Sequence, residues 1–436
     1  MSRPRRKDHC MKRIALRMIL LCLGVLLMLV GCTGGNGDDP KKTTATPTTE
    51  TPTTEAPPPS EPAFSLESLT LNGTDISQYT IVYARSPYYG VEQTYGGKIP
   101  EGELNPDQRT AERLSELIKN YFGVEIPIVE DRSTSTYLEH EILIGKTNRP
   151  QTSTVAVRMQ SERVFTLKMV DKKLIACGGS FGATWHAIDA LENRFAAALA
   201  AEESTEVAVA SGEDLSGNAP VKVVACVGDS ITFGDTSTEP AEFSYPATMG
   251  RMLWKDYVVF NYGQSGRTLC ENTSYPYSAS PQYAQCIANK ISYDLVIIIL
   301  GTNDAGLASW GSAQEADFLN SADRLVGAIQ QKNPNAKFVF ATCPYKRDAG
   351  AIANVRELQR RVVTDLRADG VDIDLFDFHR YSEVEMGTAM FPDGVHPDDA
   401  GYAKLAQGVI EVVRAVFEGG SSQYFTPTLT SVDQND

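Results

Sequence analysis

Short, wholly apolar segments alternate with longer segments of helical periodicity through the second half of the chain. Runs without a polar face, such as residues 223–227, are typical of strands buried on both sides of a parallel sheet. The predicted strands are 222–227, 258–262, 294–300, 337–342 and 372–376, and the predicted helices lie near 243–254 and at 313–331, 351–368 and 398–416. Because this alternation requires βαβ crossovers, residues 216–418 are predicted to form a three-layer α/β/α domain with a five-stranded parallel sheet.

Residues 64–215 show the pattern of a separate, smaller α/β domain. A helix is predicted from Pro106 to Phe122, because Asn105 is a good N-cap and Gly123 a good terminator. The other predicted elements are strands at 79–83, 125–129, 141–145, 164–170, 173–177 and 207–209 and a helix at 181–200, with a hairpin turn at 171–172. A polar hinge at 213–220 would join the two domains, and the polar tail at 419–436 is expected to be flexible.

Residues 1–31 have the pattern of a targeting segment. Basic residues precede an apolar run from Met18 to Val30 that is too short for a comfortable membrane span. The run ends in Leu29-Val-Gly-Cys32, which resembles the lipobox of a bacterial lipoprotein. That resemblance implies a signal peptide cleaved before Cys32, a lipid on this cysteine and anchorage in the cell membrane at the bacterial cell surface. A plain secretory signal or a short anchor remains the alternative, and Met11 is a possible start.

Residues 32–63 are rich in Thr, Pro and Glu and contain hardly an apolar side chain. Such a composition cannot bury a core, so this segment is predicted to be a disordered tether.

The chemistry of the chain is concentrated where predicted strands end. The first buried strand stops at Gly228-Asp-Ser230, and the carboxyl edge of an open α/β sheet is where active sites form. A serine nucleophile needs a base and donors for the oxyanion. Asp393 and His396 are three residues apart, so one turn can aim the carboxylate at one ring nitrogen while the other faces the serine. Asn303 follows another strand and carries an amide that can donate.

Four sequence blocks, around Ser230, Gly266, Asn303 and His396, resemble those of the SGNH (GDSL-like) serine hydrolases over about residues 222–417. The resemblance implies that Ser230 is the nucleophile, His396 the general base and Asp393 the residue that orients the imidazole. It also implies an oxyanion hole formed by the Ser230 backbone, Gly266 and Asn303, and no cofactor or metal.

Five residues near these blocks are candidates for substrate binding. They are Asp229, Arg267, Tyr275, Tyr277 and Trp310. Arg267 stands where the family often has an acidic or other polar residue after the glycine, which suggests a role in substrate choice. The aromatic rings could stack on sugar faces, although ordinary packing is the alternative.

The smaller domain resembles the small α/β domain that precedes the catalytic domain in several bacterial glycoside hydrolases. The resemblance rests on residues 141–149 and 173–179 and hints at a polysaccharide. The glycine-rich segment 178–182 could cradle a phosphate, but tight packing between strand and helix explains it better. Trp185 and His186 are interpreted as packing residues, and no site is assigned in this domain.

Charge and cysteine content narrow the functional classes. The net charge is −15, and removal of residues 1–31, which hold seven basic side chains and one acidic, would make it −21. This argues against nucleic acid as a partner and favours neutral substrates. Five cysteines remain after residue 32, and the odd number argues against a full disulfide framework. Cys226 is predicted to be a core residue, whereas Cys270 and Cys286 could be bridged.

Together these observations predict a surface-anchored serine esterase that hydrolyses short acyl esters, above all O-acetyl groups, on a polysaccharide or another acylated small molecule. A lipid-directed esterase or lysophospholipase is one alternative, favoured by nearness to the membrane. A glycan-binding protein without activity is the other. The intact set of five site residues counts against it, because binding alone does not require all five.

Overall fold

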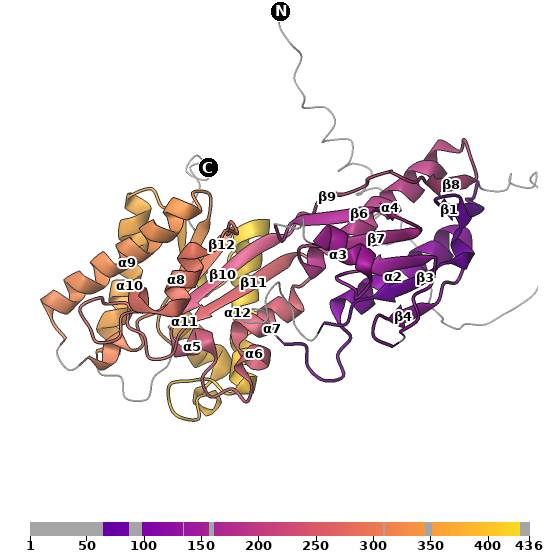
Figure 1. Ribbon diagram of the computed structural model, residues 1–436. Coiled ribbons are helices and arrows are strands. Elements are labelled where there is room, and N and C mark those ends of the chain that lie inside the picture. Colours follow the sequence, from indigo (N-terminus) through magenta and orange to yellow (C-terminus); the bar gives the residue numbers. More distant parts are fainter. Residues whose placement is uncertain are drawn as a thin grey trace, which may run out of the picture. The chain divides into compact units, whose positions relative to one another are not determined.

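The computed structural model describes residues 64–86, 98–133, 135–156, 161–307, 310–344 and 351–427 (Figure 1). The predicted signal peptide, the Cys32 lipidation site and the tether lie outside these residues. Residues 63–436 cluster as one compact unit, and the predicted domain boundary at residue 215 stays a prediction. Among the described helices, none has the length and apolar character needed to cross a bilayer.

The second half of the chain forms a sheet with the strand order β11-β10-β12-β13-β14-β15. Its strands are β10 (Lys222–Gly228), β11 (Tyr257–Gly263), β12 (Leu295–Ile299), β13 (Lys337–Ala341), β14 (Ile373–Phe376) and β15 (Phe425–Thr426). The first five are parallel, which confirms the predicted sheet.

The sixth strand corrects the prediction of a flexible tail from Gly419. β15 pairs antiparallel with β14, and Tyr424 and Phe425 are buried. Two aromatic side chains next to each other gave the tail enough apolar surface to dock on the open sheet edge. Residues 428–436 lie outside the described part of the chain.

Helices cover both faces of this sheet, as predicted for three layers (Figure 1). Val223 and Val227 of β10 share a core with Phe318, whereas Val224 and Cys226 share another core with Val413. The first core is covered by α8 (Pro281–Ala288), α9 (Ser312–Lys332) and α10 (Ile352–Ala368), and the second by α7 (Tyr245–Met252) and α12 (Asp399–Glu418). Shorter helices are α5 (Ser230–Phe233), α6 (Pro240–Phe243) and α11 (Phe378–Tyr381).

Residues 64–218 form two further sheets. The larger has the order β4-β3-β5-β7-β6-β9 and the smaller the order β2-β1-β8. Their strands are β1 (Ser68–Leu71), β2 (Thr74–Asp75), β3 (Thr80–Tyr83), β4 (Ile128–Glu130), β5 (Glu141–Ile144), β6 (Val164–Val170), β7 (Lys173–Gly178), β8 (Glu206–Val209) and β9 (Gly217–Asn218). The β6–β7 hairpin and its turn at Asp171 are as predicted. The predicted hinge contributes β9, which pairs with β6.

The helices of this region follow the sequence signals closely. α2 (Pro106–Phe122) begins where the Asn105 side chain accepts a hydrogen bond from the Gln108 N–H and ends at Gly123 with φ +72°. α2 and α4 (Phe181–Ala201) cover one face of the larger sheet, and α3 (Pro150–Ala156) lies on the other. A Cβ at Gly178 would come within 2.4 Å of the Thr184 nitrogen, which supports the packing interpretation of the glycine-rich segment.

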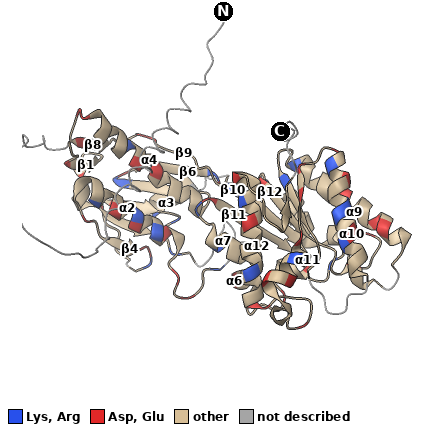
Figure 2. Cartoon of the chain, turned by 180° about the vertical axis from the view of Figure 1, so that it is seen from behind, with Lys and Arg blue, Asp and Glu red and all other residues tan. Residues whose placement is uncertain are grey.

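Charged residues gather on helices and loops, whereas the central strands are almost free of them (Figure 2). Cys270 and Cys286 are free, which corrects the suggested disulfide, and Cys226 is a core residue as predicted. The Cys270 thiol donates instead to the Gln314 carbonyl at 3.7 Å. Cys286 lies on α8, and both thiols are buried in the same core without a bond between them.

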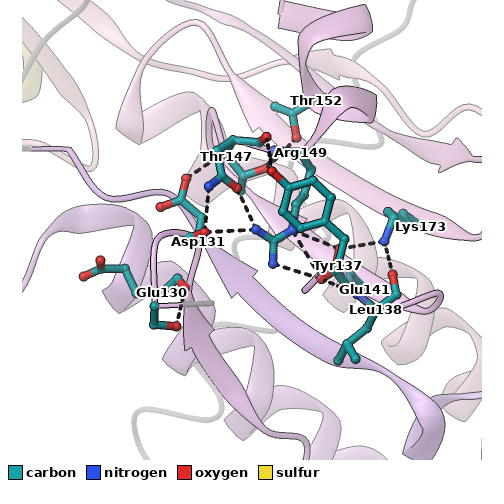
Figure 3. A network of polar contacts seen from close by, with 11 residues as sticks. Glu130, Asp131, Tyr137, Leu138, Glu141, Thr147, Arg149, Thr152 and Lys173 are labelled. Atoms are coloured by element: carbon teal, nitrogen blue, oxygen red, sulfur yellow. Dashed lines mark hydrogen bonds and ion pairs between the residues drawn. The ribbon is translucent and has the colours of Figure 1, made fainter. Parts of the chain in front are cut away.

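A buried ionic network lies in the larger sheet of residues 80–218 (Figure 3). The Arg149 guanidinium is fully buried, donates to Glu141 from Nη2 at 3.0 Å and lies 4.2 Å from the centre of the Tyr137 ring. Lys173 Nζ donates to the same carboxylate at 2.6 Å, and Arg149 Nη1 donates to the Asp131 carbonyl at 2.9 Å. Burial alone would raise the pKa of Glu141, but the hydrogen bonds from Arg149 and Lys173 hold it below its usual value.

We expect Arg149→Ala to lower the free energy of unfolding by about 3 kcal/mol or more, because it leaves a buried carboxylate with only part of its compensation. Arg361→Ala is the control, since Arg361 pairs with Asp365 in an exposed pair four residues apart, worth about 0.5 kcal/mol. Urea unfolding followed by circular dichroism measures both. Equal midpoints for the two variants would show that the network contributes no more than a surface pair.

Candidate active site

Ser230 directly follows the tight turn that joins β10 to α5. A Cβ at Gly228 would come within 2.0 Å of Thr232 Oγ1 and 2.6 Å of the Ile299 carbonyl oxygen, so only glycine lets the chain turn here without displacing its neighbours. Asp229 caps α5, and Ser230 is its first residue. The serine is 4% exposed, so the turn presents it at the carboxyl edge of the sheet with most of its surface covered.

Ser230, His396 and Asp393 form a continuous chain of hydrogen bonds. His396 Nε2 lies 2.7 Å from Ser230 Oγ, and His396 Nδ1 lies 2.6 Å from Asp393 Oδ2. The sequence separates Ser230 from His396 by 166 positions, and the loop before α12 closes that gap. The arrangement has the geometry of a nucleophile, a base and a residue that orients the base.

The Asp393 carboxylate is held in place by its own turn. Its Oδ1 accepts the backbone N–H groups of Val395 and His396, both at 2.8 Å. Burial would raise the pKa of Asp393, but hydrogen bonds from His396 and Val395 lower it below its usual value. The carboxylate therefore stays ionised and can stabilise an imidazolium ring on His396.

The strand register brings the two other sequence blocks to the same edge. Gly228 pairs with Gly263 of β11 and with Ile299 of β12, so the three strands end side by side. Gly266 follows three residues after its strand and Asn303 four residues after its strand. Gly266 has φ +72°, and no atom lies within 4 Å of the position of a Cβ. The positive φ therefore favours glycine at this position.

The loops that carry Gly266 and Asn303 are clamped to one another. Asn303 Nδ2 donates to the Arg267 carbonyl at 3.0 Å. The neighbouring Asp304 carboxylate accepts the N–H groups of Leu269 and Cys270 at 2.9 and 2.8 Å. Asp304 is completely buried, and burial raises the pKa of its carboxyl despite these hydrogen bonds. Sequence reasoning missed Asp304, although its place directly after Asn303 was a signal that could have found it.

A second residue that sequence reasoning missed is Thr236. It has φ +70°, a conformation that is strained for a β-branched side chain. Its Oγ1 donates to the Pro397 carbonyl at 2.6 Å, and nearby Thr238 donates its N–H to Asp399 at 2.9 Å. The loop after the nucleophile thereby holds the loop that carries His396. No local pattern in the sequence signals this contact.

Two of the predicted substrate-binding residues are buried, which corrects their assignment. Asp229 has no exposed surface; its Oδ1 accepts the Ile231 N–H at 3.0 Å, and burial raises the pKa of its carboxyl to about 7. Tyr277 is 1% exposed, and its hydroxyl donates to the Tyr262 carbonyl at 2.7 Å. Asp229 caps α5 through its bond to Ile231. Tyr277 packs in the core, where the Tyr262 carbonyl accepts its hydroxyl proton.

The remaining candidates reach the surface. Tyr275 is 64% exposed, and the Arg267 guanidinium carbon lies 5.9 Å from the centre of its ring. Trp310 is partly buried, and its ring packs edge-on against Phe318 at 6.5 Å between centres. Tyr275 and Arg267 therefore remain candidates for substrate binding, whereas Trp310 is engaged in packing. Among the described residues, no group of three or more His, Cys, Asp or Glu side chains could hold a metal ion.

The fold and the site define an α/β/α domain with a Ser-His-Asp triad at the carboxyl edge of a parallel sheet. Residues 226–404 match the model of the GDSL-like Lipase/Acylhydrolase family. The family predicted from the four sequence blocks is thereby confirmed.

Individual relatives match a similar part of the chain. An acetylxylan esterase of Xylanibacter ruminicola is 26% identical over 210 residues, which cover 44% of this chain and 43% of that enzyme. The match therefore spans less than half the length of this relative. A family two carbohydrate esterase of Clostridium thermocellum, solved in complex with cellohexaose, is 20% identical with a TM-score of 0.35, over 47% of this chain and 69% of that one. A lipase/acylhydrolase of Enterococcus faecalis is 20% identical with a TM-score of 0.35, over 48% of this chain and 100% of that one.

The geometry predicts that Ser230 reacts with a fluorophosphonate probe and that the reaction depends on Asp393. We expect Asp393→Asn to slow labelling by about 10²- to 10⁴-fold, because the ring loses the carboxylate that fixes its tautomer and stabilises its charge. Intact-protein mass spectrometry over time gives the rate.

Asp365→Asn is the matched control, since this exposed carboxylate on α10 pairs with Arg361 and with no other cation in the described ranges. Ser230→Ala should abolish labelling. Wild-type labelling at another residue, or an unchanged rate in Asp393→Asn, would contradict the assignment of the triad.

Proposed function

We propose that this chain is a carboxylic ester hydrolase that removes short acyl groups, chiefly O-acetyl groups, from carbohydrate. The observation that carries the proposal is the hydrogen-bond chain from Asp393 through His396 to Ser230. The match of residues 226–404 to the GDSL-like family supports the ester hydrolase activity. The acetylxylan esterase among the relatives supports the acetylated carbohydrate as substrate class.

In the proposed reaction, Ser230 Oγ attacks the carbonyl carbon of the ester and its proton passes to His396 Nε2. The ionised Asp393 stabilises the imidazolium ring that results. The C–O bond to the sugar then breaks, and His396 returns the proton to the departing sugar hydroxyl. A water molecule then gives a proton to His396 and attacks the acyl carbon. The bond from this carbon to Ser230 Oγ breaks, His396 passes the proton to Ser230 Oγ, and acetate leaves.

The tetrahedral intermediate carries its negative charge on the former carbonyl oxygen. The N–H groups of Ser230 and Gly266 and the Asn303 amide would donate to this oxygen. Asn303 Nδ2 has two hydrogens, and the Arg267 carbonyl takes only one of them. The bond to Arg267 therefore fixes the amide while it leaves a donor for the oxyanion.

We place the enzyme at the bacterial cell surface, held by a lipid on Cys32. The support comes from the sequence: a basic and apolar segment ends at Leu29-Val-Gly-Cys32, and a Thr- and Pro-rich segment follows. A tether of some thirty residues would let the folded part reach polymer beyond the membrane while it remains anchored.

The esterase proposal predicts acetate release that depends on Ser230. Full-length wild type and Ser230→Ala are compared on p-nitrophenyl acetate, p-nitrophenyl palmitate and acetylated xylan, with free acetate measured from the polymer. We expect wild type to prefer the short ester and to deacetylate xylan, and Ser230→Ala to lose about 10³-fold or more.

Preference for the palmitate ester would move the substrate to lipid. Glycan binding by both proteins without turnover of any of the three substrates would replace the esterase by a binding function.

The anchor proposal predicts that Cys32→Ser abolishes lipidation and releases the protein from the membrane fraction of a bacterial host. Mass spectrometry of the N-terminal peptide and fractionation of cells measure the two effects. Cys22→Ser is the control, because Cys22 lies within the apolar run under either start. A wild-type protein that begins upstream of Cys32, or carries no acyl mass, would contradict the proposal.

A further inference from the structure

Arg267 follows Gly266 of the proposed oxyanion hole, and no carboxylate in the described part of the chain neutralises its guanidinium. Among the described residues it forms no ion pair, and its buried Nε atom has no hydrogen-bond partner. Arg324 and Arg360 of the same domain, by contrast, lie 2.8 and 3.1 Å from carboxylates. A half-buried cation without a counter-charge in a chain of net charge −15 leaves a place for an anion from outside.

The backbone of Arg267 is fixed relative to the reacting atoms. Its carbonyl accepts the Asn303 amide at 3.0 Å, and its N–H directly follows Gly266 in the chain. A group held by the Arg267 side chain would therefore belong to the same substrate molecule as the ester, in a neighbouring subunit of the polymer. The position suits selection of the substrate rather than proton transfer, because an arginine stays charged throughout.

Tyr275 supplies an aromatic surface beside this cation. The Thr268 N–H donates to the Tyr275 carbonyl at 3.1 Å, and the Tyr277 N–H donates to the Thr268 carbonyl at 2.8 Å, so the loop holds Tyr275 close to Arg267. The guanidinium carbon lies 5.9 Å from the ring centre, and the side chain is 64% exposed. An exposed ring of this kind offers its face to the C–H face of a pyranose.

We propose that Arg267 and Tyr275 form a subsite for a uronate sugar next to the acylated sugar. Tyr275 stacks on the pyranose ring, and Arg267 pairs with its carboxylate through parallel N–H donors. The inference rests on the proposed esterase function and names its substrate class as acetylated polysaccharide that carries uronate residues. It also refines the expectation of neutral substrates, since total charge describes long-range repulsion and Arg267 acts at contact distance.

A polar groove of about 510 Å³ between this loop and α9 provides the contrast. It is lined by Glu271, Asp317 and Arg324, and Arg324 is already paired with Glu271 at 2.8 Å. The cation of this groove is neutralised within the chain, so it has no preference for an acidic sugar. Arg324 is therefore the matched control for Arg267.

The test compares acetylated glucuronoxylan with the same polymer after chemical reduction of its carboxylates to alcohols, with released acetate as the readout. We expect the kcat/KM of wild type to fall about tenfold on the reduced polymer, because a charge-assisted pair is lost while the acetylated backbone is kept. Arg267→Gln should lose most of this preference for the native polymer, and Arg267→Lys part of it. Arg324→Gln should keep the preference of wild type.

Equal kcat/KM of wild type on the two polymers overturns the subsite while the esterase function stands. If a folded Arg267→Gln variant keeps the preference for the native polymer, the subsite is also overturned, because other residues would then discriminate between the polymers. Absence of acetate release from either polymer overturns the esterase function together with the subsite. The comparison of polymers with wild type requires no variant, so the outcome does not depend on the folding of Arg267→Gln.

Discussion

The alignment of three parallel strand ends is the constraint on which the site depends. β10, β11 and β12 stop in register at Gly228, Gly263 and Ile299, and each is followed at once by a loop that carries part of the chemistry. Hydrogen bonds between the strands fix the positions at which these loops begin, and the loops alone could not fix them as rigidly. Small errors in register would move Ser230 away from the donors, since a shift of one residue displaces a strand by about 3.3 Å.

Loops anchored at one end still need a second constraint, and buried polar groups provide it. The Asp304 carboxylate holds two backbone N–H groups of the neighbouring loop, and Thr236 holds the carbonyl that follows His396. Each contact has an unfavourable component, since burial raises the pKa of Asp304 and Thr236 adopts a positive φ. Such features persist only where the surroundings enforce them, and here they join separate loops around Ser230.

The sequence predicted the elements of the sheet and missed what depends on distant contacts. Strands such as β10 and helices such as α2 carry local periodicity and capping signals, so their bounds agree with the structure to within a few residues. The tail is different, because β15 forms only where an open sheet edge receives Phe425. The burial of Tyr277 follows from the Tyr262 carbonyl beneath it, and a list of aromatic residues in a loop cannot reveal that partner.

The same distinction separates the triad from its supports. Ser230, Asn303 and His396 were predictable because their residue types and order resemble a family that residues 226–404 match. Asp304 and Thr236 act through contacts across 34 and 161 positions, which no local pattern reports. Arg267 occupies an intermediate position: the sequence showed a departure from the family at this residue, and the structure added that its charge has no carboxylate partner among the described residues.

The buried polar groups around Arg149 and those around Ser230 have opposite characters. Around Glu141, the Arg149 guanidinium and the Lys173 ammonium both donate to the buried carboxylate, so these three charges are paired within the chain. Among the described residues around Ser230, Asp229 keeps a buried oxygen without a partner, Thr236 is strained and Arg267 lacks a counter-charge. Polar groups left incomplete cost stability, and a folded chain retains them where they serve a reaction or a ligand. This contrast supports placing the chemistry at the carboxyl edge of the sheet that contains β10. It also assigns the Arg149 network a structural role.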